Sequence, residues 1–159
     1  MSLAFVALGA NLGDPLSTLR RAVESLHMLP HSQLKATSAF YRTAPVGLLN
    51  QPDFINAVAS FHTQLSPDDL LEALFAIEAQ FGRQRSVRNA PRTLDLDLLL
   101  HGEHVCEAPR LTLPHPRMHQ RAFVLVPLAE IAPTLSIPGH GPVATLLAAC
   151  ADQPIERLP

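Results

Sequence analysis

The sequence predicts an α/β (α+β) fold in which two helices cover one side of an antiparallel-rich sheet. Three observations predict it: strand-like apolar patterns in four segments, helical apolar spacing in two others, and turn residues between them. The strand-like segments are 3–8, 34–41, 54–63 and 93–100, and the helical ones are 16–26 and 67–81. Their order is β-α-β-β-α-β, the ferredoxin-like arrangement.

The strand predictions rest on which residues share a face. Segment 3–8 is apolar at nearly every position, as in a strand covered on both sides. In 54–63, one face carries Ile55, Ala57, Ala59 and Phe61, and the other carries Phe54, Asn56, Val58 and Ser60. In 93–100, one face carries Leu94, Leu96, Leu98 and Leu100, and the other carries Asp95, Asp97 and Leu99.

The helix predictions rest on start and stop signals. Asp14 precedes Pro15 as an N-cap precedes proline at the first helical position, and Ser66 precedes the second helix in the same way. Gly82 ends that second helix. After the core we expect a hairpin around 101–113 and short helices beyond Arg117.

Length and composition predict one globular domain over residues 1–159, since 47% of the residues are apolar. The apolar runs are too short to cross a bilayer, and the first residues lack the basic start of a signal peptide. Cys106 and Cys150 have no metal-binding spacing and are expected to stay reduced. We therefore expect a cytoplasmic protein without a membrane partner.

The net charge of −2 argues against a general nucleic-acid binder. The basic residues are unevenly placed: seven of the 12 lie within 83–121, and all seven are arginines. This clustering predicts a local anion site on a mildly acidic protein.

Asp95 and Asp97 are the strongest chemical signal. Two positions apart on a strand, they share a face with Cα atoms about 7 Å apart. Like charges this close are costly without cations beside them, and Mg²⁺ binds through one or two carboxylates plus substrate phosphates. Alone, the pair is equally consistent with ion pairs on a solvated face; the neighbouring arginines favour a site.

The loop 83–92 carries four of these arginines: Arg83, Arg85, Arg88 and Arg92. Guanidinium groups bind phosphate oxygens bidentately, and such a loop could close over a substrate. A solubilising surface loop is the competing interpretation, which we favour for Arg88. For Arg92, which only two residues separate from Asp95, we favour the site.

Other groups carry weaker signals. Phe54 and Asn56 offer a ring and an amide to a flat ligand, although taken alone they suit the core better. His115 stands between two prolines, where it could donate to a phosphate or simply precede a helix. The Gly9-x-Asn11-x-Gly13 loop lacks the remaining residues of a nucleotide motif, and we expect it to be mainly structural.

In this order, the pieces closely resemble the 6-hydroxymethyl-7,8-dihydropterin pyrophosphokinase family. The resemblance spans almost the whole chain. The matching stretches are GANLGD (9–14), SAFYRTAPVG (38–47), QPDFINAV (51–58), IEAQFGRQR (77–85), APRTLDLDLLL (90–100) and LTLPHPRMHQRAFVLVPLAEIAP (111–133). PRTLDLD and LPHPRM are the most specific of these motifs.

The resemblance implies transfer of pyrophosphate from ATP to the pterin hydroxymethyl group, with release of AMP and two Mg²⁺ ions held by Asp95 and Asp97. The implied catalytic residues are Arg83, Arg92, Asp95 and Asp97. The implied ATP-binding residues are Arg85, Arg92, Leu98, Arg110, His115 and Arg121. The implied pterin-binding residues are Thr43, Val46, Phe54, Asn56, Asp95 and Phe123.

The chain departs from many relatives at Asn89-Ala90, where they carry a Trp-Gly or similar pair, and at Phe75, where some are polar near the nucleotide. Relatives are often fused to other folate enzymes, for which 159 residues leave no room. We expect small-molecule partners only and a monomer, with a homodimer as the alternative. Two other functions stay open: a ferredoxin-like RNA-binding module and a two-metal phosphohydrolase.

Overall fold

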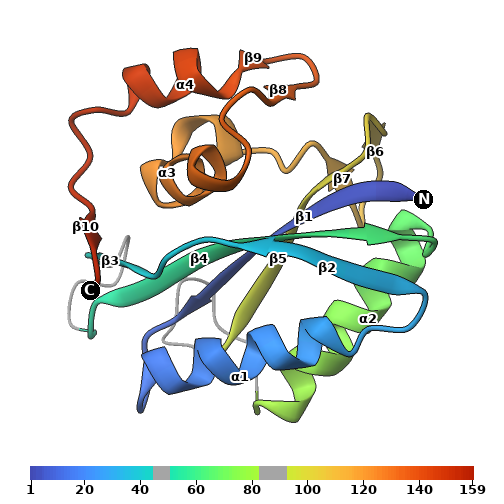
Figure 1. The fold of residues 1–159 in the computed structure, drawn as a ribbon, viewed down its shortest axis with the longest axis horizontal. Helices are drawn as coiled ribbons and strands as arrows, with labels where there is room; N and C mark the ends of the chain where they lie inside the picture. The colour runs from blue at the N-terminus through green and yellow to red at the C-terminus, as the bar shows by residue number, and fades with distance from the viewer. Residues whose placement is uncertain (45–50, 83–92) are drawn as a thin grey trace.

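The computed structural model describes residues 1–44, 51–82 and 93–159 (Figure 1). The elements of the core are β1 (Ser2–Ala10), α1 (Pro15–His27), β2 (Ser32–Thr37), β3 (Tyr41–Thr43), β4 (Phe54–Thr63), α2 (Pro67–Gln80) and β5 (Asp95–His101). The rest are β6 (Cys106–Glu107), β7 (Thr112–Leu113), the 3-10 turn η1 (Met118–Gln120), α3 (Ala122–Ile131), β8 (Ser136–Ile137), β9 (Gly141–Pro142), α4 (Val143–Ala149) and β10 (Glu156–Arg157).

The main sheet confirms the predicted topology. Its strands run β10-β3-β4-β1-β5, with β2 paired to the same edge of β4 as β3. Every pairing is antiparallel. β1 lies between β4 and β5, so two strands that are distant in sequence both border the first one.

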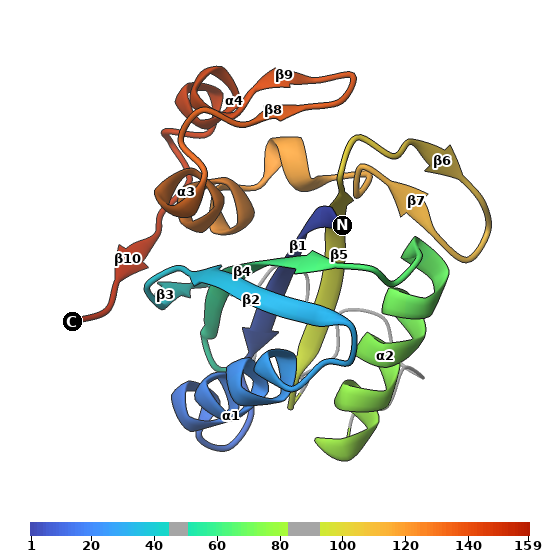
Figure 2. The ribbon, with the colours of Figure 1, turned by 45° about the vertical axis from the view of Figure 1, so that its right-hand side comes forward.

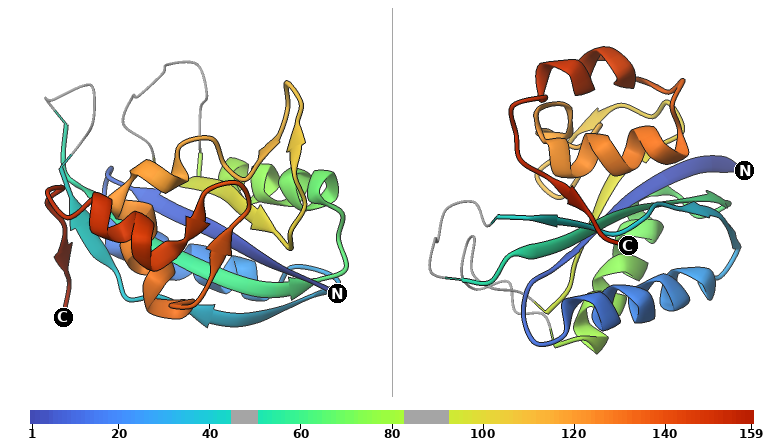
Figure 3. Two further views of the ribbon diagram at one scale, coloured as in Figure 1. Left: turned by 90° about the horizontal axis from the view of Figure 1, so that it is seen from above. Right: turned by 60° about the vertical axis from the view of Figure 1, so that its left-hand side comes forward.

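Helices cover both faces of this sheet (Figures 1 and 2). α1 and α2 pack on one face over a core that includes Leu19, Leu74 and Phe61. α3, with α4 outside it, packs on the other face over a second core that includes Phe5 and Leu125. The right-hand view of Figure 3 shows the same three layers. The predicted short helices therefore give the sheet a second covered face.

The predicted helix starts are confirmed. Asp14 Oδ1 accepts the Ser17 N–H at 3.2 Å, and Ser66 Oγ accepts the Asp69 N–H at 3.1 Å, which satisfies an N-terminal donor of each helix. Gly82 follows α2 with φ 78°, a conformation that glycine adopts without strain. Within the described segments, no helix has the length and hydrophobicity needed to cross a membrane.

The predicted second strand, 34–41, is divided into β2 and β3. Ser38 lies between them, and its side chain takes part in the pairing: Ser38 Oγ accepts the Val58 N–H at 2.9 Å. Because a hydroxyl replaces a backbone carbonyl there, the regular ladder stops and restarts at Tyr41. β3 thereby comes to lie beside the start of β4.

The strict alternation predicted for 93–100 fails at its end. Phe5 pairs with Leu100 and Val6 with Leu98, so Leu99 is an extra residue of β5, as in a β-bulge. Leu99 and Leu100 therefore both belong to the core under α3, while Leu98 belongs to the core under α2. The strand itself begins at Asp95 rather than at residue 93.

Glu78 of α2 supports β5 from the side away from β1. This glutamate is 1% exposed, and its Oε2 accepts the Leu96 N–H at 2.7 Å. Leu96 lies between Asp95 and Asp97, so a buried carboxylate holds the backbone that carries both aspartates.

Replacing Glu78 with alanine should lower the free energy of unfolding by about 1–3 kcal/mol, because a buried donor loses its acceptor. Urea unfolding checks this. Glu78→Gln is the matched control, since its amide oxygen can still accept the Leu96 N–H, and it should cost less. An alanine variant with the wild-type unfolding midpoint would contradict this role for Glu78.

Candidate active site

A cavity of about 660 Å³ opens on the α3 side of the sheet. Residues from β1, β3, β4, β5, η1, α3 and the C-terminal segment line it. Most of the described residues predicted from the sequence meet here: Thr43, Phe54, Asn56, Asp95, Asp97, Arg121 and Phe123.

Small residues of β1 form the floor. Gly9 pairs with Asn56 on one side and with Asp95 on the other, and Ala7 pairs with Asp97. A Cβ placed on Gly9 would lie 3.4 Å from Asn56 Oδ1. The cavity therefore exists because β1 carries almost no side chain between the amide and the carboxylates. We expected a mainly structural role for Gly9, but it lines the cavity.

The two aspartates lie on the cavity face of β5, as their spacing predicts. Both line the cavity and are half-buried, whereas Leu94, Leu96 and Leu98 point into the opposite core. No cluster of three or more metal-binding side chains occurs within residues 1–44, 51–82 and 93–159. Two carboxylates beside open space nevertheless match the ligand set that Mg²⁺ uses together with substrate phosphates.

Arg121 faces these carboxylates from the start of α3. Burial and, more weakly, the positive charge of Arg117 lower its pKa, whereas the negative charges of Asp97 and Asp95 oppose this shift. Its Cζ also lies 5.4 Å from the centre of the Phe123 ring, a cation–π contact. Arg117 adds a second guanidinium to the cavity wall.

His115 lies close enough to Arg121 to feel its positive charge. Its N–H donates to Leu99 O at 3.0 Å, and its Nδ1 accepts the Arg117 N–H at 3.5 Å. Burial, with the positive charge of Arg121, lowers the pKa of His115 to about 4, although Asp95 opposes the shift. The ring is therefore neutral at pH 7, with Nε2 as its donor atom.

Rings and an amide form the other end of the cavity. Phe54 and Phe123 are both half-buried in its wall. Asn56, 5% exposed, donates from Nδ2 to Thr43 Oγ1 at 2.7 Å, which fixes the orientation of its amide. The core role that these residues alone suggested for Phe54 is therefore not what the structure shows.

β3, which carries Thr43, is tied to α3. Tyr41 OH donates to Glu130 Oε1 at 2.5 Å, and the Ala39 N–H donates to both oxygens of the same carboxylate. Burial and this bond raise the pKa of Tyr41 to about 12, so it remains protonated. Asn11 holds the residues that lead into β4. Its Nδ2 donates to Gln51 Oε1 at 2.7 Å and to Pro52 O at 3.1 Å.

Some predicted residues lie elsewhere. Leu98 is 3% exposed in the core under α2, and Arg110 forms an ion pair with Glu72 of α2 in the exposed hairpin region. Five further predictions lie outside the described residues: Val46, Arg83, Arg85, Arg88 and Arg92.

The sequence did not identify Gln120, Gln153 and Pro154 as part of the cavity. The last two belong to the C-terminal segment, which returns to pair with β3. No local sequence pattern predicts that the final residues pair with β3, because this contact joins segments that are far apart in the sequence.

At one end of the cavity, two phenyl rings and an amide can bind a flat heteroaromatic ring. At the other end, the carboxylate pair can bind a cation and the guanidinium can bind an anion. Residues 5–133 match the model of the family described as 7,8-dihydro-6-hydroxymethylpterin-pyrophosphokinase (HPPK).

Two curated relatives are each named 2-amino-4-hydroxy-6-hydroxymethyldihydropteridine pyrophosphokinase. The protein from Pseudomonas aeruginosa is 49% identical over 155 residues, which cover 98% of this chain and 96% of the relative. The protein from Haemophilus influenzae is 44% identical over 158 residues, which cover 99% of both chains.

Among solved structures, Plasmodium falciparum HPPK-DHPS with pteroate matches at a TM-score of 0.74 over 93% of this chain, with 12% sequence identity. The chain spans 42% of the length of that structure, and the match shows the ferredoxin-like fold with its added helices. These relatives support neither an RNA-binding module nor a phosphohydrolase. The chain belongs to the 7,8-dihydro-6-hydroxymethylpterin-pyrophosphokinase family.

Proposed function

We propose that this chain transfers the pyrophosphoryl group of Mg-ATP to the hydroxymethyl group of 6-hydroxymethyl-7,8-dihydropterin, releasing AMP, in folate biosynthesis. The observation that carries the proposal is that Asp95, Asp97 and Arg121 line the same cavity as Phe54 and Phe123. The family and the named relatives support this activity, with ATP as co-substrate.

The pterin takes the aromatic end of the cavity. Its ring would lie between Phe54 and Phe123, where stacking is favourable for a flat heteroaromatic ligand. The Thr43 hydroxyl already engages Asn56 Nδ2, so Asn56 Oδ1 is left to accept an N–H of the pterin edge. Backbone groups of Thr43 and Val46 are proposed to meet the same edge.

The phosphate chain takes the polar end. Asp95 and Asp97 would hold Mg²⁺, for which we propose two ions, since a carboxylate pair can hold two ions about 3.5–4 Å apart. Bound magnesium supplies charge neutralisation on the phosphate oxygens. The donor set fits, because both carboxylates lie on one face of β5 beside the open cavity.

Arg121 and His115 would act on the phosphates in two different ways. The guanidinium of Arg121 neutralises charge, whereas neutral His115 donates a hydrogen bond from Nε2 without adding charge. Leu98, whose side chain is buried, would contribute through its backbone, and Arg110 would have to leave Glu72 to reach ATP. Arg83, Arg85 and Arg92 are proposed to close the polar end from their loop.

In the transfer, the hydroxymethyl oxygen forms a bond to the β-phosphorus, and the bond from that phosphorus to the oxygen of the α-phosphate breaks. The hydroxyl proton is released, and AMP leaves with the bridging oxygen. The residues orient the reactants and neutralise charge, so the reaction needs no covalent enzyme intermediate.

We further propose that residues 1–159 act as one domain, as a monomer, on small molecules in the cytoplasm. The net charge of −2 supports the view that nucleic acid is not a partner.

Incubation with Mg-ATP and the reduced hydroxymethylpterin tests the function, with AMP and the pterin diphosphate measured together. Equal amounts of the two products are expected. Release of inorganic phosphate or pyrophosphate, with the pterin unchanged, would instead indicate a hydrolase.

Asp97→Asn should reduce turnover by about a hundredfold or more, because a metal ligand that stabilises the transition state is worth several kcal/mol. Circular dichroism should show an intact fold. The control is Asp68→Asn, an exposed aspartate in the first turn of α2, which should keep the wild-type rate. A near-normal rate for Asp97→Asn would contradict the metal assignment.

Gly9→Val should raise the KM for the pterin about tenfold or more, because added methyl groups crowd the floor beside Asn56. The KM for ATP should change much less. Gly139→Ala in the β8–β9 turn is the control: its φ of 77° makes alanine strained there, so stability should fall while both KM values stay unchanged. Unaltered pterin kinetics in Gly9→Val would show that the pterin binds elsewhere.

His115 should make the protein less stable as the pH falls from 6.5 to 4. Its folded pKa of about 4 lies below the ordinary 6.5, so the unfolded chain takes up the proton first. This contribution, at most about 3 kcal/mol, is complete above pH 6.5 and is lost below it. Urea unfolding at pH 7 and 4.5 should show a smaller loss for His115→Gln than for the wild type; equal losses would contradict the depressed pKa.

A further inference from the structure

The C-terminal segment reaches the cavity at Gln153 and Pro154, and the side chain of Gln153 makes two hydrogen bonds there. Its Oε1 accepts the Ala122 N–H at 2.9 Å, and its Nε2 donates to Gln120 O at 2.9 Å. These two backbone groups belong to the peptide units on either side of Arg121. One side-chain amide therefore brackets the residue that faces the aspartates.

This bracket holds Arg121 in a defined conformation. Arg121 is extended, with φ −119° and ψ 113°, and it is the N-cap residue of α3 without a side-chain capping bond of its own. In an extended residue, the preceding carbonyl and the following N–H point to the same side, so one amide can engage both. Gln153 thus satisfies an N-terminal donor of α3 and fixes the backbone from which the guanidinium extends.

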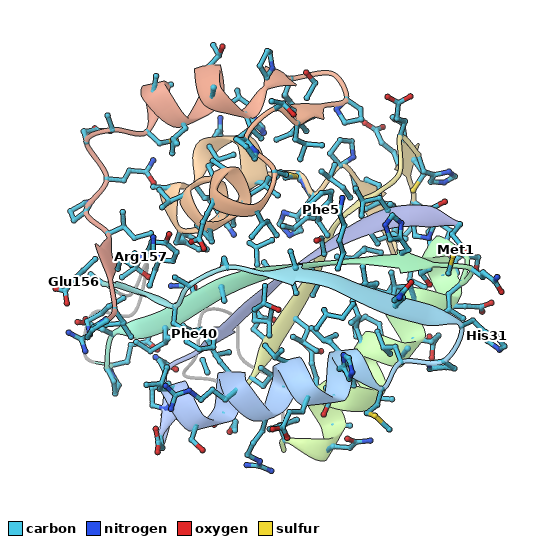
Figure 4. The ribbon with its side chains drawn as sticks, viewed as in Figure 1. Met1, Phe5, His31, Phe40, Glu156 and Arg157 are labelled. Carbon is cyan, nitrogen blue, oxygen red and sulfur yellow. The ribbon has the colours of Figure 1, made fainter. Side chains whose placement is uncertain are left out.

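Gln153 is itself anchored from both sides. Its N–H donates to Cys150 O at 3.0 Å, at the end of α4, and Cys150 is buried. Beyond Pro154, β10 pairs with β3, with Glu156 opposite Arg42. In Figure 4, Glu156 and Arg157 lie at the edge of the sheet, where the C-terminus ends.

We propose that Gln153 is a positioning residue for nucleotide binding: through its two hydrogen bonds it aims Arg121 at the polyphosphate. The inference rests on the proposed function, because it takes Arg121 as a phosphate ligand. It does not make Gln153 a catalytic residue, since its amide acts on the backbone around Arg121.

The test is Gln153→Met, which keeps the side-chain length and loses both hydrogen bonds. Calorimetric titration with Mg²⁺ and α,β-methylene-ATP, which cannot transfer its pyrophosphoryl group, should show an affinity about tenfold lower than for the wild type. The affinity for hydroxymethyldihydropterin should fall much less, by about twofold, because Phe54 and Asn56 stand on β4 and only Phe123 stands beside the backbone that Gln153 holds. Gln33→Met, at an exposed position of β2 outside the cavity, should leave both affinities unchanged.

An unchanged nucleotide affinity would overturn the inference, and so would an equal loss for both ligands with a lower melting temperature, which indicates a merely structural role. If Gln153→Met does not fold, NMR of the wild type decides. The Arg121 Nε–H and the Gln153 side-chain amide should shift together when the nucleotide analogue binds, and independent behaviour would overturn it. Failure of the wild type to bind nucleotide at all would instead remove the proposed function.

Discussion

The site depends on the antiparallel register that places Asn56, Gly9 and Asp95 side by side on β4, β1 and β5. Because side chains alternate between faces, a shift of one residue in either pairing would send the amide or the carboxylates into the opposite core. Buried leucines under α1 and α2, on the sheet face opposite the cavity, secure this register. The face left free of large side chains on β1 then becomes the cavity floor.

Electrostatics divides the cavity into two ends. Two carboxylates on one strand face repel each other, and Arg121 offsets part of that repulsion. Burial and the same guanidinium lower the pKa of His115, so this ring is neutral at pH 7 and adds no positive charge beside Arg121. The aromatic end is uncharged, and the hydrogen bond from Asn56 Nδ2 to Thr43 Oγ1 fixes the orientation of its amide.

The sequence predicted what local rules control. Asp14 and Ser66 cap helices as expected, and the spacing of Asp95 and Asp97 placed both on one face. The strand predictions failed where a single residue changes the backbone pairing. Ser38 interrupts the strand that was predicted through 34–41, and the extra residue Leu99 moves Leu100 to the other core. The sequence also missed contacts made by chain return, such as Gln153, because no short-range pattern encodes them.

The C-terminal segment links the two ends of the cavity mechanically. At one end Gln153 engages the backbone around Arg121, and at the other β10 pairs with β3, the strand that carries Thr43. The carboxylate of Glu130 adds a second tie, from α3 to Tyr41 of the same strand. Since both ties join α3 to β3 across the cavity, a displacement of either wall must stretch hydrogen bonds at the other. The separation between the aromatic end and the carboxylate end is thus set by contacts within the protein, as in-line transfer between two substrates bound at the proposed positions would require.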